Sequence, residues 1–273
     1  MVMEQDIFLK ISKIYKVDQE EAKFFLDLYS AFLEVNNDFL FNYNVLTRNH
    51  ITNLEDFKKW RVNYATINGH VKALSLCGCN LKKIPESIKS LNELEYLNLS
   101  RNHLKSIPDS IYDFASKNMT SKYIEEGVIP KEAPVLGLLE ILQGRKLEKG
   151  EEKEDCMWEL GACHYAINNN GNIKGIYVNG ELGDKIHWLE FFPEQICELE
   201  SLENLILSTL DIGFIPESIS NLTSLKRLVM FFNRIRKIPE SMKNLSSLEE
   251  LDLRDNLIQE IPEWTRQIKD LKI

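Results

Sequence analysis

The side chains best suited to chemistry in this 273-residue chain are five cysteines and five histidines, and their spacing favours no catalytic or metal site. Cys77 and Cys79 stand two positions apart, but no second cysteine pair follows at the spacing of a zinc or redox site. The histidines are scattered and form no His-Glu-x-x-His pattern. Gly144-Arg145-Lys146 lacks the earlier glycine and the following Ser or Thr of a phosphate-binding loop. We therefore predict no enzymatic activity, no metal site and no cofactor.

Composition and charge limit the cellular compartment and the classes of partner that the sequence favours. An odd number of cysteines without a framework spacing favours a reducing compartment, and Glu4 and Asp6 interrupt the stretch where an export signal would be apolar. The longest apolar run, residues 135–142, is broken by Gly137 and Glu140, so no membrane span is expected. A formal net charge of -9 disfavours nucleic acid as a partner. These features predict a cytoplasmic protein that contacts neither membrane nor nucleic acid.

A repeated pattern must position any functional residues. Aliphatic side chains recur at positions 1, 4, 6, 11 and 14 of each copy, Pro follows at position 15, and the starts lie 23 positions apart (71 to 94, 202 to 225, 225 to 248). The five copies begin at Val71, Leu94, Leu202, Leu225 and Leu248. A sixth, degenerate copy opens with Ile173, Ile176 and Val178 and closes with Phe192 and Pro193. The alternation at positions 4 and 6 predicts a short strand that points these side chains into a core, and Pro ends the extended segment.

This pattern resembles the leucine-rich repeat, and most closely the intracellular kind with Ile-Pro-x-x-Ile endings found in Ras-suppressor-like and plant Ras-group-related proteins. The resemblance implies an α/β solenoid, a horseshoe with a parallel sheet on its concave face. It also implies that Asn at position 9 bonds backbone groups in each bend and forms a ladder. One repeat cannot stand alone, because burying its roughly seven aliphatic side chains, at ~1.5–3 kcal/mol each, does not offset ordering its backbone at ~1–2 kcal/mol per residue. Stability must come from stacking.

Two repeat blocks are separated by residues 115–172, and each block is preceded by the same apparent pattern. Asn63–Val71 and His164–Ile173 both read as a strand, a Gly-containing turn and a first repeat strand, which indicates a β-hairpin. Glu21-Ala22 and Glu132-Ala133 lie upstream in apolar helical stretches. We predict a helix and a hairpin as the cap of each block. The resulting domains are a helical N-terminal cap (1–62), a hairpin with two repeats (63–114), a helical and hairpin insertion or second cap (115–172), and four repeats (173–273).

Two further expectations concern segments outside the repeats. The helical stripe of Ile7, Ile11 and Ile14 is expected to pack on the end of the solenoid, with a partner-binding helical module as the alternative. Residues 145–155 are charged and lack apolar periodicity, so an exposed loop is expected there.

The concave face offers one candidate site. If positions 4 and 6 point inward, positions 3, 5 and 7 face the open side of the sheet and position 8 lies at its margin. Most of these positions are polar, but four on adjacent strands are apolar and have arginines beside them, as in an aromatic centre with a polar rim. The predicted protein-binding residues are Ile206, Arg227, Val229, Phe231, Phe232 and Arg254; the four apolar ones we call the concave patch. Two alternatives are that Phe232 folds over the edge, or that the loop from Gly180 to Leu189 covers the patch.

These observations favour a non-enzymatic interaction scaffold that binds a protein partner of unknown identity on the concave face. One alternative is a regulatory or effector protein linked to an enzyme such as a ubiquitin ligase or a small GTPase. Another is a purely structural spacer, for which changes on the concave face would have no effect. A fold alone does not decide among them.

Overall fold

The computed structural model describes residues 12–13, 16–35, 50–51, 62–150, 163–180 and 189–273. The chain divides into two compact units. The first unit comprises residues 1–118 and 141–144, and the second comprises 119–140 and 145–273. This division runs at 118/119 and through a helix. The domain boundaries placed by the sequence at 62/63, 114/115 and 172/173 stay predictions. The stripe of Ile7, Ile11 and Ile14 and the end of the predicted 145–155 loop lie outside the described residues.

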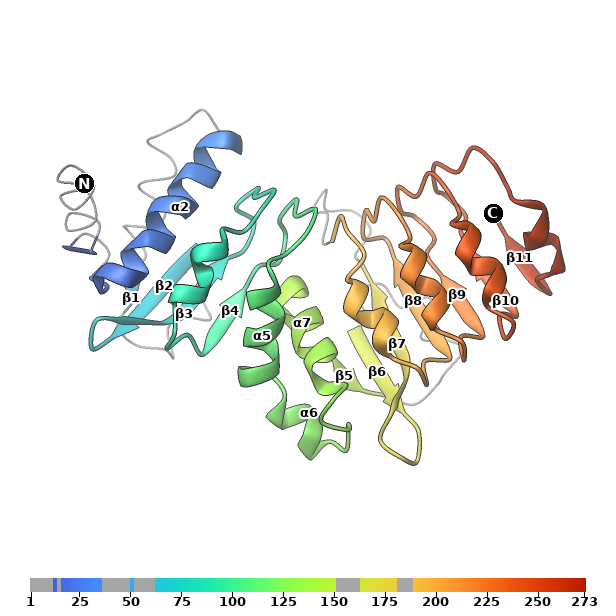
Figure 1. Cartoon of the computed structure of the whole chain (residues 1–273), viewed down its shortest axis with the longest axis horizontal. Helices are drawn as coiled ribbons and strands as arrows, with labels where there is room; N and C mark the ends of the chain where they lie inside the picture. Colours follow the sequence, from blue (N-terminus) through green and yellow to red (C-terminus); the bar gives the residue numbers. More distant parts are fainter. Residues whose placement is uncertain (1–11, 14–15, 36–49, 52–61, 151–162, 181–188) are drawn as a thin grey trace. The chain divides into compact units, whose positions relative to one another are not determined.

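The first unit is a short mixed sheet with a helix before it and repeats after it (Figure 1). Its strands lie in the order β1-β2-β3-β4; β1 and β2 are parallel, β2 and β3 form an antiparallel hairpin, and β3 and β4 are parallel. The elements are α2 (Gln19–Val35), β1 (His50–Ile51), β2 (Val62–Ile67), β3 (His70–Leu76), the 3₁₀ helix η1 (Glu86–Ser90), β4 (Tyr96–Asn98) and α5 (Asp109–Asn118).

The second unit repeats this plan with a longer run of repeats. Its sheet has the order β5-β6-β7-β8-β9-β10-β11, with β6 and β7 antiparallel and all other neighbours parallel. The strands are β5 (Glu148–Lys149), β6 (Cys163–Ile167), β7 (Ile173–Asn179), β8 (Asn204–Ser208), β9 (Arg227–Val229), β10 (Glu250–Asp252) and β11 (Asp270–Lys272). The helices are α6 (Ser121–Glu125), α7 (Ala133–Gln143), η3 (Glu194–Glu198), η4 (Glu217–Asn221), η5 (Glu240–Asn244) and η6 (Glu263–Gln267). Each of η3 to η6 begins directly after the repeat proline.

Strand register confirms the predicted fold class, a leucine-rich-repeat stack with a parallel sheet. Equal repeat positions face one another across neighbouring strands, as in Leu205, Leu228 and Leu251 at position 4. All three side chains are fully buried. The position-4 and position-6 side chains of successive repeats therefore build one continuous core within the second unit.

The asparagine hydrogen bonds implied by the resemblance are present in both units, at Asn102 in the first and at Asn233 and Asn256 in the second. The Asn233 carboxamide accepts hydrogen bonds from the Ile212 and Leu210 N–H groups at 2.9 and 3.3 Å. It donates to the carbonyls of Leu207 and Met230 at 2.7 and 3.0 Å. Asn102 and Asn256 make the equivalent bonds in their repeats. These side chains satisfy backbone groups at the bends that leave the sheet, which a buried turn requires.

The two caps are copies of one local structure. In the first cap, formed by α2 and the β2–β3 hairpin, the Asp18 N–H bonds the Gly69 carbonyl at 3.0 Å. In the second, formed by α7 and the β6–β7 hairpin, Ile129 N–H bonds the Gly171 carbonyl at 3.0 Å. Both hairpins shift register at the same point, after Ala65 in one and after Ala166 in the other.

A buried glutamate joins helix to hairpin in each cap. The Val71 N–H donates to both carboxylate oxygens of Glu21 at 3.2 and 3.0 Å, and the Ile173 N–H donates to Glu132 at 2.6 Å. Burial is the main cause that raises the pKa of Glu21 to about 7, the Val71 N–H opposing it. In both caps the residue after the glutamate is alanine, Ala22 in the first and Ala133 in the second. The glutamate thus satisfies a buried backbone N–H at the start of the first repeat strand.

Candidate protein-binding face

The sheet register of the second unit sets two residues of the concave patch, Ile206 and Val229, in a single row. Tyr177 pairs with Ile206, Ile206 with Val229, and Val229 with Asp252. Neighbouring strands lie ~4.8 Å apart, so side chains in one row pack against one another. The row changes from apolar on β7, β8 and β9 to charged on β10 and β11.

The patch is much less exposed than the sequence suggested. Ile206, Val229 and Phe231 are only 1, 2 and 8 % exposed, and they form one buried cluster with Tyr177 and Ala166. The expectation that these three present an open apolar surface is wrong, because all three side chains are buried within one cluster. The loop considered as a cover, residues 181–188, lies outside the described residues.

Phe232 is the member of the patch that reaches solvent, with 46 % of its surface exposed. Its ring meets Phe231 edge-on, with centroids 5.7 Å apart. Its backbone φ is 52°, and every position 8 of the five regular repeats has a positive φ. The others are Gly78, Arg101, Thr209 and Asp255. The repeat imposes this conformation, since the N–H at position 8 bonds a carbonyl of the next repeat in three of them. A bulky aromatic residue is an unfavourable choice for such a backbone.

Both predicted arginines hold acidic partners on the concave face. The Arg227 Nε lies 2.6 Å from a Glu250 carboxylate oxygen. Arg254 donates to both carboxylate oxygens of Asp252, at 2.9 and 2.6 Å, while 45 % of its side chain stays exposed. Glu250 also binds Lys272 at 3.1 Å. These ion pairs therefore hold the charges in fixed positions near β9, which pre-organises them for a partner.

Asp252 corrects a second expectation. The sequence placed it on the open face, and it does lie there, yet it is only 2 % exposed. The Arg254 side chain folds back on it and forms a two-pronged ion pair.

Three residues outside the predicted binding set complete this face. Tyr177 fills the β7 end of the row and is 3 % exposed. The His164 ring stacks on it at 4.4 Å between centroids, with the planes 9° apart. Gly175 lies beneath, where an added Cβ would stand 2.6 Å from the tyrosine ring. Only the cross-strand pairing of His164 with Tyr177 could have indicated this stack, and pairing partners follow from the hairpin register.

The two described thiols of the second unit, Cys163 and Cys197, are not poised for nucleophilic chemistry. Burial raises the pKa of Cys163 to about 12 and that of Cys197 to about 11. In the first unit, burial also raises the pKa of Cys79, so Cys79 is not an activated thiolate. A reactive cysteine needs its pKa lowered. Within the described residues, no helix is long and apolar enough to cross a bilayer.

Comparison with known proteins identifies the repeats. A family model described as "Leucine Rich repeats (2 copies)" matches residues 223–266, and one described as "Leucine Rich Repeat" matches residues 93–114. These segments are leucine-rich repeats. They contain β9, β10 and Phe232 in one case and β4 in the other. No curated protein matches the sequence.

Several solved structures are similar to parts of the chain. The PEPR1–AtPEP1 complex is 29 % identical over 44 % of this chain and 16 % of its own, with a TM-score of 0.33. A leucine-rich-repeat protein of Leptospira interrogans is 19 % identical over 78 % of this chain and 59 % of its own, with a TM-score of 0.32. Internalin C2 of Listeria monocytogenes is 16 % identical over 74 % and 79 %, with a TM-score of 0.34. The chain thus spans less than two thirds of the length of the first two.

Proposed function

We propose that the second unit is a protein-binding module whose concave face docks a protein partner, with Phe232 as the anchor and Arg254 beside it. Leucine-rich repeats support an interaction role at the coarse level. The observation that carries the finer proposal is Phe232 itself: a half-exposed phenylalanine held at a φ of 52°.

A strained and exposed aromatic residue requires a reason. Left-handed φ costs a non-glycine residue ~1–2 kcal/mol, and Gly78 occupies the same repeat position without that cost. An exposed phenylalanine also offers no burial energy to the free protein. Strain of this kind collects where a side chain serves binding, and a rigid aromatic side chain buries a large area with little loss of entropy.

The site residues predicted from the sequence have three roles in this proposal. Phe232 and Arg254 contact the partner, since each is nearly half exposed. Ile206, Val229 and Phe231 support them from below as a buried floor. Arg227, one quarter exposed and bound to Glu250, fixes the polar edge. The partner surface that fits is an apolar pocket with an acidic rim near Arg254.

The test compares two phenylalanines of nearly equal exposure. Phe232→Gly removes the proposed anchor and relieves the backbone, so the free energy of unfolding should change by less than ~1 kcal/mol. Phe214 is 47 % exposed but lies past the bend, beside η4, and Phe214→Gly is the matched control. Quantitative affinity capture should identify proteins that bind wild type and Phe214→Gly but not Phe232→Gly. Equal capture by all three, with both variants folded, would refute the anchor and favour a structural spacer.

The setting is part of the same proposal. The Ile-Pro-x-x-Ile endings support repeats of the intracellular, Ras-suppressor-like kind, and the free cysteines support a cytoplasmic location. The raised thiol pKa values support a non-enzymatic role. A link to an enzyme such as a ubiquitin ligase or small GTPase would then act through the bound partner.

A further inference from the structure

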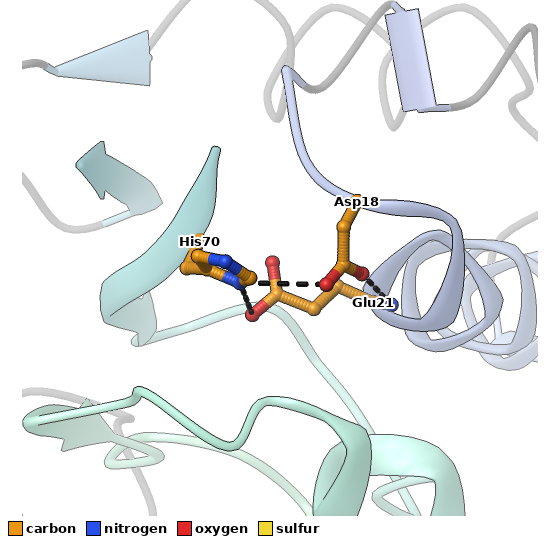
Figure 2. A group of neighbouring side chains, drawn as sticks. All are labelled: Asp18, Glu21 and His70. Atoms are coloured by element: carbon orange, nitrogen blue, oxygen red, sulfur yellow. Dashed lines mark hydrogen bonds and ion pairs between the residues drawn. The ribbon is translucent and has the colours of Figure 1, made fainter. Parts of the chain in front are cut away.

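Three side chains that are distant in the sequence meet at the first cap. Figure 2 shows the His70 imidazole directed at the carboxylates of Asp18 and Glu21, which lie at the start of α2. His70 Nδ1 is 3.4 Å from Asp18 Oδ2 and 3.7 Å from Glu21 Oε1. One ligand atom from each residue can be chosen so that all three lie within 4.8 Å of one another.

We propose that Asp18, Glu21 and His70 bind a divalent transition metal ion of the Zn²⁺ class, which fastens the first cap to the first repeat strand. Ligand atoms ~2.0–2.1 Å from a tetrahedral ion stand ~3.3–3.4 Å apart, close to the two distances from His70. One imidazole and two carboxylates suit Zn²⁺ and its neighbours in the first transition row, and three protein ligands leave a position for water.

The second ring nitrogen of His70 faces a carboxylate, as is usual for a histidine that ligates a metal ion. His70 Nε2 lies 3.6 Å from Glu93 Oε1, on the side away from the two ligand carboxylates. Lys72 Nζ holds the other Glu93 oxygen at 3.0 Å. A histidine that ligates through one nitrogen almost always directs the other at a carboxylate or carbonyl, which fixes the ring and its tautomer. Glu93 is in position to do so after a small movement.

The second cap shows what the fold needs without a metal ion. There the equivalent glutamate, Glu132, makes the same bond to the strand N–H, and its second oxygen accepts 3.0 Å from the Asn172 amide. Asn172 stands where the first cap has His70, and Ile129 stands where it has Asp18. The cap fold therefore requires only the glutamate. The first cap has, in addition, two residues that can ligate a metal ion, Asp18 and His70, where the second cap has Ile129 and Asn172.

Access and consequence follow from the same contacts. Glu21 is buried, while Asp18 and His70 are 40 and 35 % exposed, so an ion can enter from solvent and keep a water molecule. Asp18 and Glu21 belong to the beginning of α2, and His70 is the first residue of β3. A bound ion would link these two segments and should stabilise the first unit in proportion to its affinity.

The experiment titrates tag-free, full-length protein, stripped with EDTA and dialysed, with ZnCl₂ in a calorimeter and with CoCl₂ by visible absorption. His70→Asn copies the second cap, and Asp18→Asn keeps the oxygen that caps the Glu21 N–H at 2.7 Å. Glu21 itself is left unchanged because its loss would damage the fold. His103→Asn changes a histidine of the same unit outside the cluster.

We expect one Zn²⁺ per chain and a Zn²⁺-dependent rise in melting temperature for wild type and His103→Asn. Affinity should fall at least about tenfold in His70→Asn and Asp18→Asn, and about tenfold or more in Glu93→Gln, with unchanged circular dichroism in EDTA. The Co²⁺ spectrum should disappear with His70→Asn. Absence of binding to wild type, or equal binding by wild type and both Asn variants, overturns the site and leaves an ion-pair cluster only.

Discussion

Replacing the ladder residue Asn233 with alanine should destabilise the second unit by ~3–5 kcal/mol. Asn233 is 6 % exposed, and its carboxamide joins two backbone N–H groups and three carbonyls at 2.7–3.3 Å. Each hydrogen bond contributes ~0.5–1.5 kcal/mol, and a buried group left without a partner costs ~1–3 kcal/mol. The two shortest bonds, to the Ile212 N–H and the Leu207 carbonyl, carry most of this cost.

Urea denaturation followed by circular dichroism measures the effect, with Asn244→Ala as the control. Asn244 ends η5 and is exposed, so its replacement should change the free energy of unfolding by no more than ~0.5 kcal/mol. A loss below ~1 kcal/mol for Asn233→Ala, or equal losses for the two variants, would show that water replaces the carboxamide and that the ladder does not stabilise the bends.

Three further predictions follow from single side chains. In urea melts, Leu251→Ala should lower the free energy of unfolding by ~2–5 kcal/mol because Leu251 is fully buried. Asp252→Ala should lower it by ~1 kcal/mol or more because Arg254 loses its ion-pair partner. A loss under ~0.5 kcal/mol for Asp252→Ala would contradict a stabilising ion pair. In EDTA, the Glu21 carboxyl should stabilise the folded state fully below pH 4.5 and lose that contribution as the pH rises to about 7, because its pKa is raised in the folded protein. In thermal melts, the stability advantage of wild type over Glu21→Gln should therefore shrink by up to ~3 kcal/mol across this pH window. An advantage that does not depend on pH would contradict the raised pKa. Cys197, with its pKa raised to about 11, should resist iodoacetamide at pH 8 until the protein is denatured, and rapid labelling seen by mass spectrometry would contradict its burial.

The repeat architecture was predictable because its causes are local. Leucines two positions apart specify a strand, Pro at position 15 ends the extended segment, and a fixed period places Leu205, Leu228 and Leu251 in register. The cap duplication was visible for a similar reason, since Glu21-Ala22 and Glu132-Ala133 keep one order in both copies.

The accessible surface was not predictable, because it depends on which side chains meet across strands. Alternation put Ile206 and Val229 on the same side of the sheet, and they do share one cluster, but facing one side did not mean reaching solvent. The cover comes from neighbours such as Tyr177, whose flat position depends on Gly175. Likewise, the proximity of His70 and Asp18 could not be predicted, because the two residues are far apart in the sequence and meet only where the start of α2 packs on the β2–β3 hairpin.

Hydroxyl-radical footprinting of the protein alone and with its captured partner tests the central claim most directly. Phe232 and Phe214 are 46 and 47 % exposed, so the two rings should oxidise at similar rates in the free protein. If the partner docks on the concave face, oxidation of Phe232 should fall several-fold on binding while that of Phe214 stays the same. Protection of Phe214 alone, or of neither ring in a saturated complex, would contradict the account and place the binding surface elsewhere.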